Sequence, residues 1–360
     1  MINANQFNSK NFKVASFYET IDKDSTKTVK CLLCSHYCII KNKNYGICKV
    51  RFNYEGKLYT ITWGLAEGLA IDPIEKKPLY HFKPSSKVLS FGTPGCNFFC
   101  LNCQNNSLSQ LIKKTDITEF KQKNVEPSEI LQLALYNSVD GIAYTYSEPT
   151  IFFEYARDII YLSKNNKDTT NLFHLFVSNG YFSKELLNTI VDEKLIDAIN
   201  IDLKFFDEKK YKKITGGSLI PVLDSIRFLY ENKIHIEITN LVIPDINDTD
   251  EDFQKLTSFV ASVSTEIPLH ISRFYPHYKM LSKTPTQLEK LLRAKEIAQN
   301  NGLNYVYIGN TDLPKVENTY CPKCNYLLIE RKRYRIFVNF ELKKNNNFCP
   351  ICGNNIKIIV

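Results

Sequence analysis

The chain has 360 residues, a formal net charge of +8 and an apolar fraction of 44%, which is ordinary for a soluble globular protein. No apolar run is long enough to span a membrane and no secretory segment opens the chain, so we expect a cytoplasmic protein. Basic residues fall in short scattered runs, such as residues 331–333, which are typical of a solvated surface and disfavour nucleic acid as a partner.

The first part of the chain combines a polar start with a group of four cysteines. Residues 1–30 show no clear periodicity, and we expect them to form a poorly ordered lead-in. Residues 31–86 carry the pattern C-x2-C-x3-C-x9-C and then short strands such as residues 57–62. Four thiolates suit either zinc or a second iron–sulfur cluster, and His36 is placed to replace one thiolate; the spacing does not separate the two metals. The four cysteines are Cys31, Cys34, Cys38 and Cys48.

From residue 87 the sequence alternates between strand-like and helix-like segments. Strands are expected at residues 87–92, 141–147, 173–178, 198–204, 235–243, 268–275 and 305–309. Helices are expected at residues 126–137, 183–194, 219–231, 249–264 and 286–301. Thr249 and Ser183 suit helix N-caps, and Gly302 suits a helix C-cap. This alternation implies a parallel sheet with right-handed crossovers. The number of repeats favours a barrel or partial barrel over a dinucleotide-binding sheet, for which the Gly-x-Gly-x-x-Gly turn is missing.

A second group of cysteines follows the first of these strands, and it has three members. Cys96, Cys100 and Cys103 form C-x3-C-x2-C after a Gly/Pro turn. A cubane iron–sulfur cluster has four irons, so three local thiolates leave one iron open for a reacting ligand. The alternative is a zinc knuckle with a distant fourth ligand, since structural zinc takes four closed ligands. The position in a loop after a strand, where barrels carry their reactive groups, favours the catalytic cluster.

The last cysteine group forms two paired knuckles separated by strand-like residues 335–339. This C-x2-C-x24-C-x2-C pattern predicts a zinc ribbon, and disulfides are disfavoured in a cytosolic protein. The ligands would be Cys321, Cys324, Cys349 and Cys352. We therefore expect an α/β chain in three parts. These are an N-terminal segment with a four-cysteine metal module (1–86), a barrel (87–312) and a zinc-ribbon-like module (313–360).

The triad and its surroundings resemble the radical S-adenosylmethionine (SAM) superfamily, in which C-x3-C-x2-C holds a [4Fe–4S] cluster and SAM chelates the fourth iron. The pattern C-N-x-x-C-x-x-C-x-N over residues 96–105 resembles the version in pyruvate formate-lyase activating enzymes. Further stretches resemble the AmmeMemoRadiSam-system radical SAM proteins, which are relatives of those activating enzymes. They are the first tetrad, residues 72–82, 268–274 and 305–310, and the final ribbon. The resemblance runs from about Cys31 to the C-terminus and implies a partial (β/α)6 TIM-like barrel with its site at the C-terminal ends of the strands.

The resemblance also implies roles for polar residues at the ends of strands. Glu148, in a Ser-Glu-Pro-Thr turn, would pair with the α-ammonium group of SAM. Asp202 and Lys204 would lie near the methionine carboxylate and the ribose. The alternatives are a helix N-terminal glutamate for Glu148 and an ion pair at the barrel rim for Asp202 and Lys204.

Three further residues are candidates for contact with the cofactor. Asn179 suits either a hydrogen bond to a polar ligand or a plain Asn-Gly turn. Arg273, at the end of the sixth strand, is our choice over His270 and His277 for a group facing substrate or ribose. Asn102 departs from the superfamily, which commonly has an aromatic residue there. Its amide could hydrogen-bond the adenine edge, without stacking.

The resemblance implies a radical SAM enzyme. Its reduced cluster cleaves SAM to methionine and a 5′-deoxyadenosyl radical, which abstracts hydrogen from a substrate. In activating enzymes that hydrogen comes from a glycine of a partner protein. Expected partners are a one-electron donor such as ferredoxin or flavodoxin, and a protein substrate. A ribbon and an N-terminal metal module beside the barrel mouth would suit a protein, and a small molecule is the alternative. Two other functions stay open: radical SAM modification of RNA, and non-catalytic electron transfer by an iron–sulfur protein.

Overall fold

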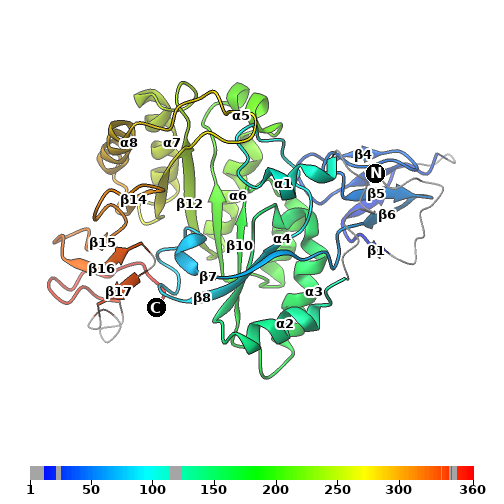
Figure 1. Ribbon diagram of the computed structural model, residues 1–360, viewed down its shortest axis with the longest axis horizontal. Helices are drawn as coiled ribbons and strands as arrows, with labels where there is room; N and C mark the ends of the chain where they lie inside the picture. Colours follow the sequence, from blue (N-terminus) through cyan, green and yellow to red (C-terminus); the bar gives the residue numbers. More distant parts are fainter. Residues whose placement is uncertain (1–11, 22–25, 114–123, 334, 340–341, 343–346) are drawn as a thin grey trace.

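A curved, mostly parallel sheet forms the centre of the computed structural model, which describes residues 12–21, 26–113, 124–333, 335–339, 342 and 347–360 (Figure 1). Seven parallel strands follow one another in chain order. They are β8 (Lys87–Gly92), β9 (Gly141–Tyr144), β10 (Phe173–Ser178), β11 (Ala198–Asp202), β12 (His235–Val242), β13 (Leu269–Arg273) and β14 (Val306–Gly309). An eighth strand, β7 (Glu67–Pro73), pairs antiparallel with β8, so β7 and β14 are the two edges of an open sheet.

Helices connect the parallel strands, and all but the first and shortest of them, which follows β8 at the C-terminal ends of the strands, pack along the outside of the curved sheet (Figure 1). They are α1 (Asn106–Ser109), α2 (Pro127–Tyr136), α3 (Phe153–Lys164), α4 (Lys184–Asp192), α5 (Glu208–Thr215), α6 (Ile220–Glu231), α7 (Asp250–Val263) and α8 (Leu288–Asn300). Six strand–helix units are followed by β14, and this confirms the predicted partial (β/α)6 barrel.

Local sequence explains where several of these elements begin and end. The side chains of Thr249 and Ser183 accept backbone hydrogen bonds at the N-termini of α7 and α4, as predicted. Gly302 follows α8 with a positive φ of 88°, the left-handed backbone that favours glycine. The second predicted strand ends three residues early, at Tyr144, because Tyr146 has a left-handed φ of 62° that breaks the extended chain.

The N-terminal segment forms two small antiparallel sheets at one end of the molecule (Figure 1). Its strands are β1 (Lys13–Val14), β2 (Tyr18–Thr20), β3 (Val29–Cys31), β4 (Ile39–Ile40), β5 (Arg51–Tyr54) and β6 (Lys57–Thr60). The expectation of a poorly ordered lead-in is therefore wrong for residues 12–21, because β1 pairs with β6 and β2 with β3. Residues 1–11 and 22–25 lie outside the described part.

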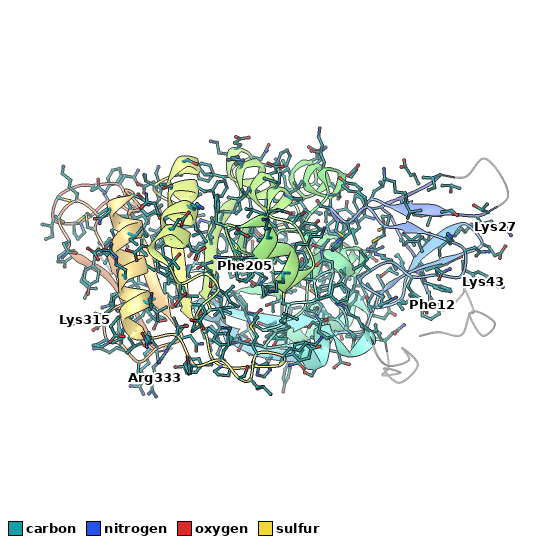
Figure 2. All side chains as sticks on the ribbon, turned by 90° about the horizontal axis from the view of Figure 1, so that it is seen from above. Phe12, Lys27, Lys43, Phe205, Lys315 and Arg333 are labelled. Atoms are coloured by element: carbon teal, nitrogen blue, oxygen red, sulfur yellow. The ribbon has the colours of Figure 1, made fainter. Side chains whose placement is uncertain are left out.

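The C-terminal module forms a three-stranded antiparallel sheet at the opposite end, from β15 (Thr319–Tyr320), β16 (Leu327–Lys332) and β17 (Arg335–Val338). Figure 2 shows this separation, with Lys27 and Lys43 at one end and Lys315 and Arg333 at the other. Among the described residues, no helix is both long and apolar enough to cross a membrane.

Candidate active site

A cavity of about 400 Å³ lies at the C-terminal ends of the parallel strands. All three cysteines of the triad line it, together with five of the six residues expected to contact the cofactor: Asn102, Glu148, Asn179, Asp202 and Lys204. Arg273 is not among the lining residues. Its Nε donates a 2.8 Å hydrogen bond to the carbonyl oxygen of Thr286, which turns the guanidinium into the following loop.

The triad lies in the loop between β8 and α1. Gly95, with a φ of 108°, begins this loop, and a Cβ there would lie 2.6 Å from Cγ1 of Val50, so only glycine fits. The backbone N–H of Phe98 lies 3.3 Å from the sulfur of Cys96. Burial raises the pKa of the Cys100 thiol to about 11 and raises that of Cys96 as well. Binding of iron must therefore displace protons from these thiols.

Asn102 supplies a direct sign that this cavity takes a polar ligand. Its side-chain Oδ1 is buried and, among the described residues, has no hydrogen-bond partner. Buried oxygens are seldom left unpaired, because the lost hydration is not recovered. An acceptor at this position fits the exocyclic amino group of an adenine, which is a hydrogen-bond donor. The donor set around the cavity thus fits both an iron–sulfur cluster and a nucleoside ligand.

Glu148 has a fully buried carboxylate, and its two oxygens accept different numbers of hydrogen bonds. Oε1 accepts hydrogen bonds from the backbone N–H and the hydroxyl of Thr150 and from the hydroxyl of Ser178. Oε2 accepts one, from the backbone N–H of Asn179 at 2.8 Å. Burial raises the pKa of Glu148, while these four donors oppose the rise. Oε2 keeps room for one more donor, so the capping role and a role in binding an ammonium group are compatible.

Asp202 and Lys204 form an ion pair at the end of β11, with Nζ of Lys204 2.8 Å from Oδ2 of Asp202. Both side chains line the cavity, so the ion pair is observed and is compatible with the predicted contact with a ligand. Burial alone would lower the pKa of Lys204, but the adjacent Asp202 carboxylate and the Cys100 thiolate raise it. Lys204 therefore stays cationic beside the triad.

Several cavity residues were not predicted from the sequence. Lys77, whose side chain is 3% exposed, donates to Oδ2 of Asp72 at 2.8 Å, and the hydroxyl of Tyr146 donates to the same oxygen at 2.7 Å. Asn200 and Thr239 line the floor of the cavity and bond to each other at 2.9 Å. A period-two signal was present, since Asn200 lies two residues before Asp202 on the same face of β11.

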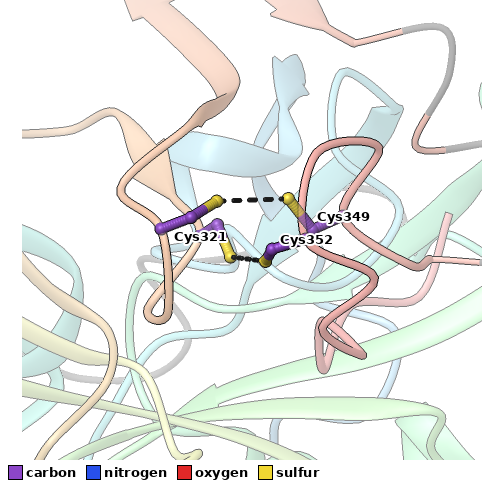
Figure 3. A group of neighbouring side chains, drawn as sticks. Cys321, Cys349 and Cys352 are labelled. Carbon is purple, nitrogen blue, oxygen red and sulfur yellow. Dashed lines mark hydrogen bonds between the residues drawn. The ribbon is translucent and has the colours of Figure 1, made fainter.

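The four sulfurs of the C-terminal tetrad are spaced closely enough to bind a single metal ion. The sulfurs of Cys321, Cys324, Cys349 and Cys352 all lie within 4.8 Å of one another, and two of the pairs are 3.6 Å apart (Figure 3). Four ligands at the usual zinc–sulfur distance of about 2.3 Å put the sulfurs about 3.8 Å apart. This part of the chain could therefore hold a metal ion, as the zinc-ribbon prediction requires.

The position of the ribbon differs from the one expected. The ribbon's Arg331 and Lys357 bond to Tyr80 and His81, whose backbone N–H groups donate to the buried carboxylate of Glu237. Glu237 is the third residue of β12, and so lies at the N-terminal ends of the strands. The cavity lies at their C-terminal ends, so the expectation of a ribbon beside the barrel mouth is wrong.

The N-terminal tetrad borders the other side of the triad loop. Cys31, Cys34, Cys38 and Cys48 line a second, smaller cavity together with His36. The Nε2 atom of His36 forms a 2.9 Å hydrogen bond with the carbonyl oxygen of Asn97, the residue after Cys96.

Comparisons with known proteins agree with this geometry. The family model of the radical SAM superfamily matches residues 91–260 of this chain. An uncharacterized protein of Methanocaldococcus jannaschii, MJ0808, is 39% identical over 96% of this chain and 99% of its own length. A second protein of that archaeon, provisionally named a glycyl-radical enzyme activating enzyme, is 33% identical over 61% of this chain and 79% of its own length.

Among solved structures, a radical SAM methyltransferase from Sphaerobacter thermophilus aligns with a TM-score of 0.49 and 11% identity, over 88% of this chain and 81% of that one. The match to the superfamily covers the triad loop and strands β9 to β12, whose ends line the cavity, and the second archaeal relative is named as an activating-enzyme homologue. The chain is a radical SAM enzyme and belongs to the radical SAM superfamily.

Proposed function

We propose that this enzyme cleaves SAM at a [4Fe–4S] cluster held by Cys96, Cys100 and Cys103, and abstracts a hydrogen atom from a protein or peptide. The observation that carries the proposal is that the triad shares one cavity with a buried carboxylate, Glu148. Cys96, Cys100 and Cys103 would hold the cluster, which when reduced would supply the one electron needed to cleave the S–C5′ bond of SAM to methionine and a 5′-deoxyadenosyl radical.

The chain's own residues bind and orient SAM. Oε2 of Glu148 accepts a charge-assisted hydrogen bond from the α-ammonium group. Lys204, kept cationic by Asp202, would attract the methionine carboxylate, and Asp202 would accept hydrogen bonds from the ribose hydroxyls. Oδ1 of Asn102 accepts from the adenine amino group in place of an aromatic stacking partner. Asn179 holds the triad loop in place through its bond to Asn97.

The proposed hydrogen donor is a glycine residue of a partner protein. Two relatives support it by their names, the activating-enzyme homologue of M. jannaschii and the pyruvate formate-lyase-activating enzyme of Staphylococcus epidermidis, which is 27% identical over 62% of this chain and 89% of its own length. The second partner is a low-potential one-electron donor of the ferredoxin or flavodoxin class.

The test is anaerobic reconstitution with iron and sulfide, followed by dithionite, SAM and an assay for 5′-deoxyadenosine. The wild type should form 5′-deoxyadenosine, and a Cys96→Ala/Cys100→Ala/Cys103→Ala variant should form none. The matched control is Cys324→Ser, which removes one ligand from the distant ribbon and should leave the yield unchanged. Equal yields from the wild type and the triad variant would reject the assignment.

A further inference from the structure

The N-terminal tetrad differs from the ribbon tetrad in the spacing of its sulfurs. In the described part of the chain, which includes all eleven cysteines, only the ribbon brings three or more sulfurs within 4.8 Å of one another. No three sulfurs of the N-terminal tetrad meet that limit, although all four line one cavity. One zinc ion would hold four sulfurs about 3.8 Å apart. An iron–sulfur cluster holds its thiolates farther apart, since each binds a different iron.

We propose that Cys31, Cys34, Cys38 and Cys48 hold a second iron–sulfur cluster, and that this cluster passes single electrons to the cluster at the triad. The first half depends only on the tetrad itself. The second half rests on the proposed function of the triad. The wider spacing is shared by the triad, so both groups suit clusters and the ribbon suits one ion.

The surroundings of the tetrad suit an anionic, thiolate-ligated cluster. Arg51, whose side chain is 1% exposed and forms an ion pair with the buried Glu154 at 2.6 Å, lines the cavity and also interacts electrostatically, more weakly, with Cys31 and Cys48. Asn97 also lines it, is fully buried, and has a side-chain Nδ2 with no partner among the described residues. An unpaired N–H donor suits a cluster sulfur, because hydrogen bonds to the sulfurs help to set cluster potentials.

A short route joins the tetrad to the triad. Cys96 is followed by Asn97, whose carbonyl oxygen lies 2.9 Å from Nε2 of His36, and His36 is two residues after Cys34. The loops also touch directly, since a Cβ on Gly95 would lie 3.5 Å from the carbonyl oxygen of Cys48. The side chains of Val50 and Ile151 pack at the same point, so the two loops share one packed boundary across which single electrons would pass.

The electron transfer involves no bond and no proton. A [4Fe–4S]+ cluster held by Cys31, Cys34, Cys38 and Cys48 would be oxidised to the 2+ state by one electron, and a [4Fe–4S]2+ cluster held by the triad would be reduced to the 1+ state by the same electron. An acidic one-electron carrier protein of the ferredoxin or flavodoxin class then reduces the tetrad cluster again. The carrier is oxidised by one electron in each cycle.

The outer face over the tetrad suits such a carrier. Ile39 is 68% exposed and Ile47 is 39% exposed, and the exposed cations Lys41 and Lys43 lie beside them in sequence. Figure 2 shows Lys43 at this end of the molecule. An apolar centre with basic neighbours is complementary to an acidic protein and increases its association rate.

The first experiment isolates the tetrad in full-length protein that lacks the triad, Cys96→Ala/Cys100→Ala/Cys103→Ala. After anaerobic reconstitution, iron, acid-labile sulfide and zinc are measured per chain, and the dithionite-reduced protein is examined by EPR. We expect one cluster's iron and sulfide, one zinc and a [4Fe–4S]+ signal. Two zinc ions and no iron would overturn the proposal. This result does not depend on SAM chemistry, so it is separate from failure of the proposed function.

The second experiment follows electron delivery in the wild type by freeze-quench EPR after mixing with reduced flavodoxin and SAM. The tetrad signal should rise first and the SAM-perturbed triad signal after it. A triad signal that rises first would overturn the relay. Lys41→Glu/Lys43→Glu should slow reduction by flavodoxin about tenfold or more at low salt, within the range of electrostatic steering, and leave reduction by dithionite unchanged. The matched control, Lys212→Glu/Lys213→Glu on α5, should reduce at the wild-type rate, and equal slowing by both pairs would overturn the docking face.

Discussion

The side-chain Nδ2 of Asn179 donates a 2.7 Å hydrogen bond to Oδ1 of Asn97, and this bond ties the end of β10 to the loop that carries the triad. Both residues are buried, and the Oδ1 of Asn179 also accepts from the backbone N–H of Tyr181. One polar side chain thus fixes the position of the cysteine loop over the parallel sheet.

Asn179→Ala should reduce the free energy of unfolding by about 1–3 kcal/mol, because it leaves two buried polar groups without partners. Urea unfolding of the zinc-loaded protein measures this, with the exposed Asn171→Ala as the matched control. The control should change stability by less than about 0.5 kcal/mol. Equal losses from both variants would contradict a special role for the bond between Asn179 and Asn97.

Glu148→Gln should weaken SAM binding about tenfold or more, since a charge-assisted hydrogen bond contributes about 1.5–3 kcal/mol. Iron content should not change, because Glu148 is not proposed as an iron ligand. SAM titrations of the reconstituted protein measure the affinity, and Glu251→Gln on the surface of α7 is the control. Wild-type affinity in Glu148→Gln would remove this residue from the SAM site and leave it as a helix cap.

His81 gives a pH dependence to the contact between barrel and ribbon. Burial lowers its pKa to about 4, whereas the unfolded value is about 6.5. Between those values the unfolded chain binds a proton that the folded chain does not. Stability is therefore complete above about pH 6.5 and falls as the pH decreases to about 4, by about 3 kcal/mol.

His81→Gln should remove this part of the pH dependence, because glutamine can bond to Tyr307 and Lys357 without titrating. The measurement is the free energy of unfolding between pH 4 and 7 for wild type, His81→Gln and the control His277→Gln. Parallel curves for the wild type and His81→Gln would show that His81 does not contribute the predicted proton.

Cys321→Ser should open the ribbon while the barrel stays folded. Zinc binding contributes on the order of 10 kcal/mol to small zinc domains, and one lost thiolate removes most of that free energy. Limited proteolysis should cleave the variant after Tyr320 while the fragment before it survives. Lys323→Ala, in the same knuckle but not a ligand, should remain resistant. A resistant tail in Cys321→Ser would argue against a structural metal.

Most of the barrel could be predicted from the sequence because its signals are local. Strand periodicity, the caps at Thr249 and Ser183, and the turn before Cys96 depend on neighbouring residues alone. The resemblance to radical SAM proteins, rather than local signals, implied the roles of Glu148, Asp202 and Lys204, and these residues line one cavity because parallel strands end at one edge of the sheet.

Long-range contacts account for what the sequence did not predict. The side chain of Arg273 donates a hydrogen bond to Thr286, thirteen residues later. The alternation of residues along a strand does not predict that its side chain turns towards this loop. Within residues 72–82, Lys77 lines the cavity, whereas the backbone N–H groups of Tyr80 and His81 donate to Glu237 near the N-terminal end of β12. This course also determines where the ribbon packs, and it depends on pairings between residues more than 150 positions apart.

The most direct test of the account is whether SAM binds to the cluster at the triad. SAM is titrated into the dithionite-reduced wild-type protein and into the triad variant, and the EPR spectrum of the cluster is recorded at each step. The account predicts that SAM changes the g-values of a cluster signal in the wild type, and that the triad variant shows no SAM-dependent change. A wild-type spectrum that SAM leaves unchanged would contradict the account and indicate an iron–sulfur protein that only carries electrons.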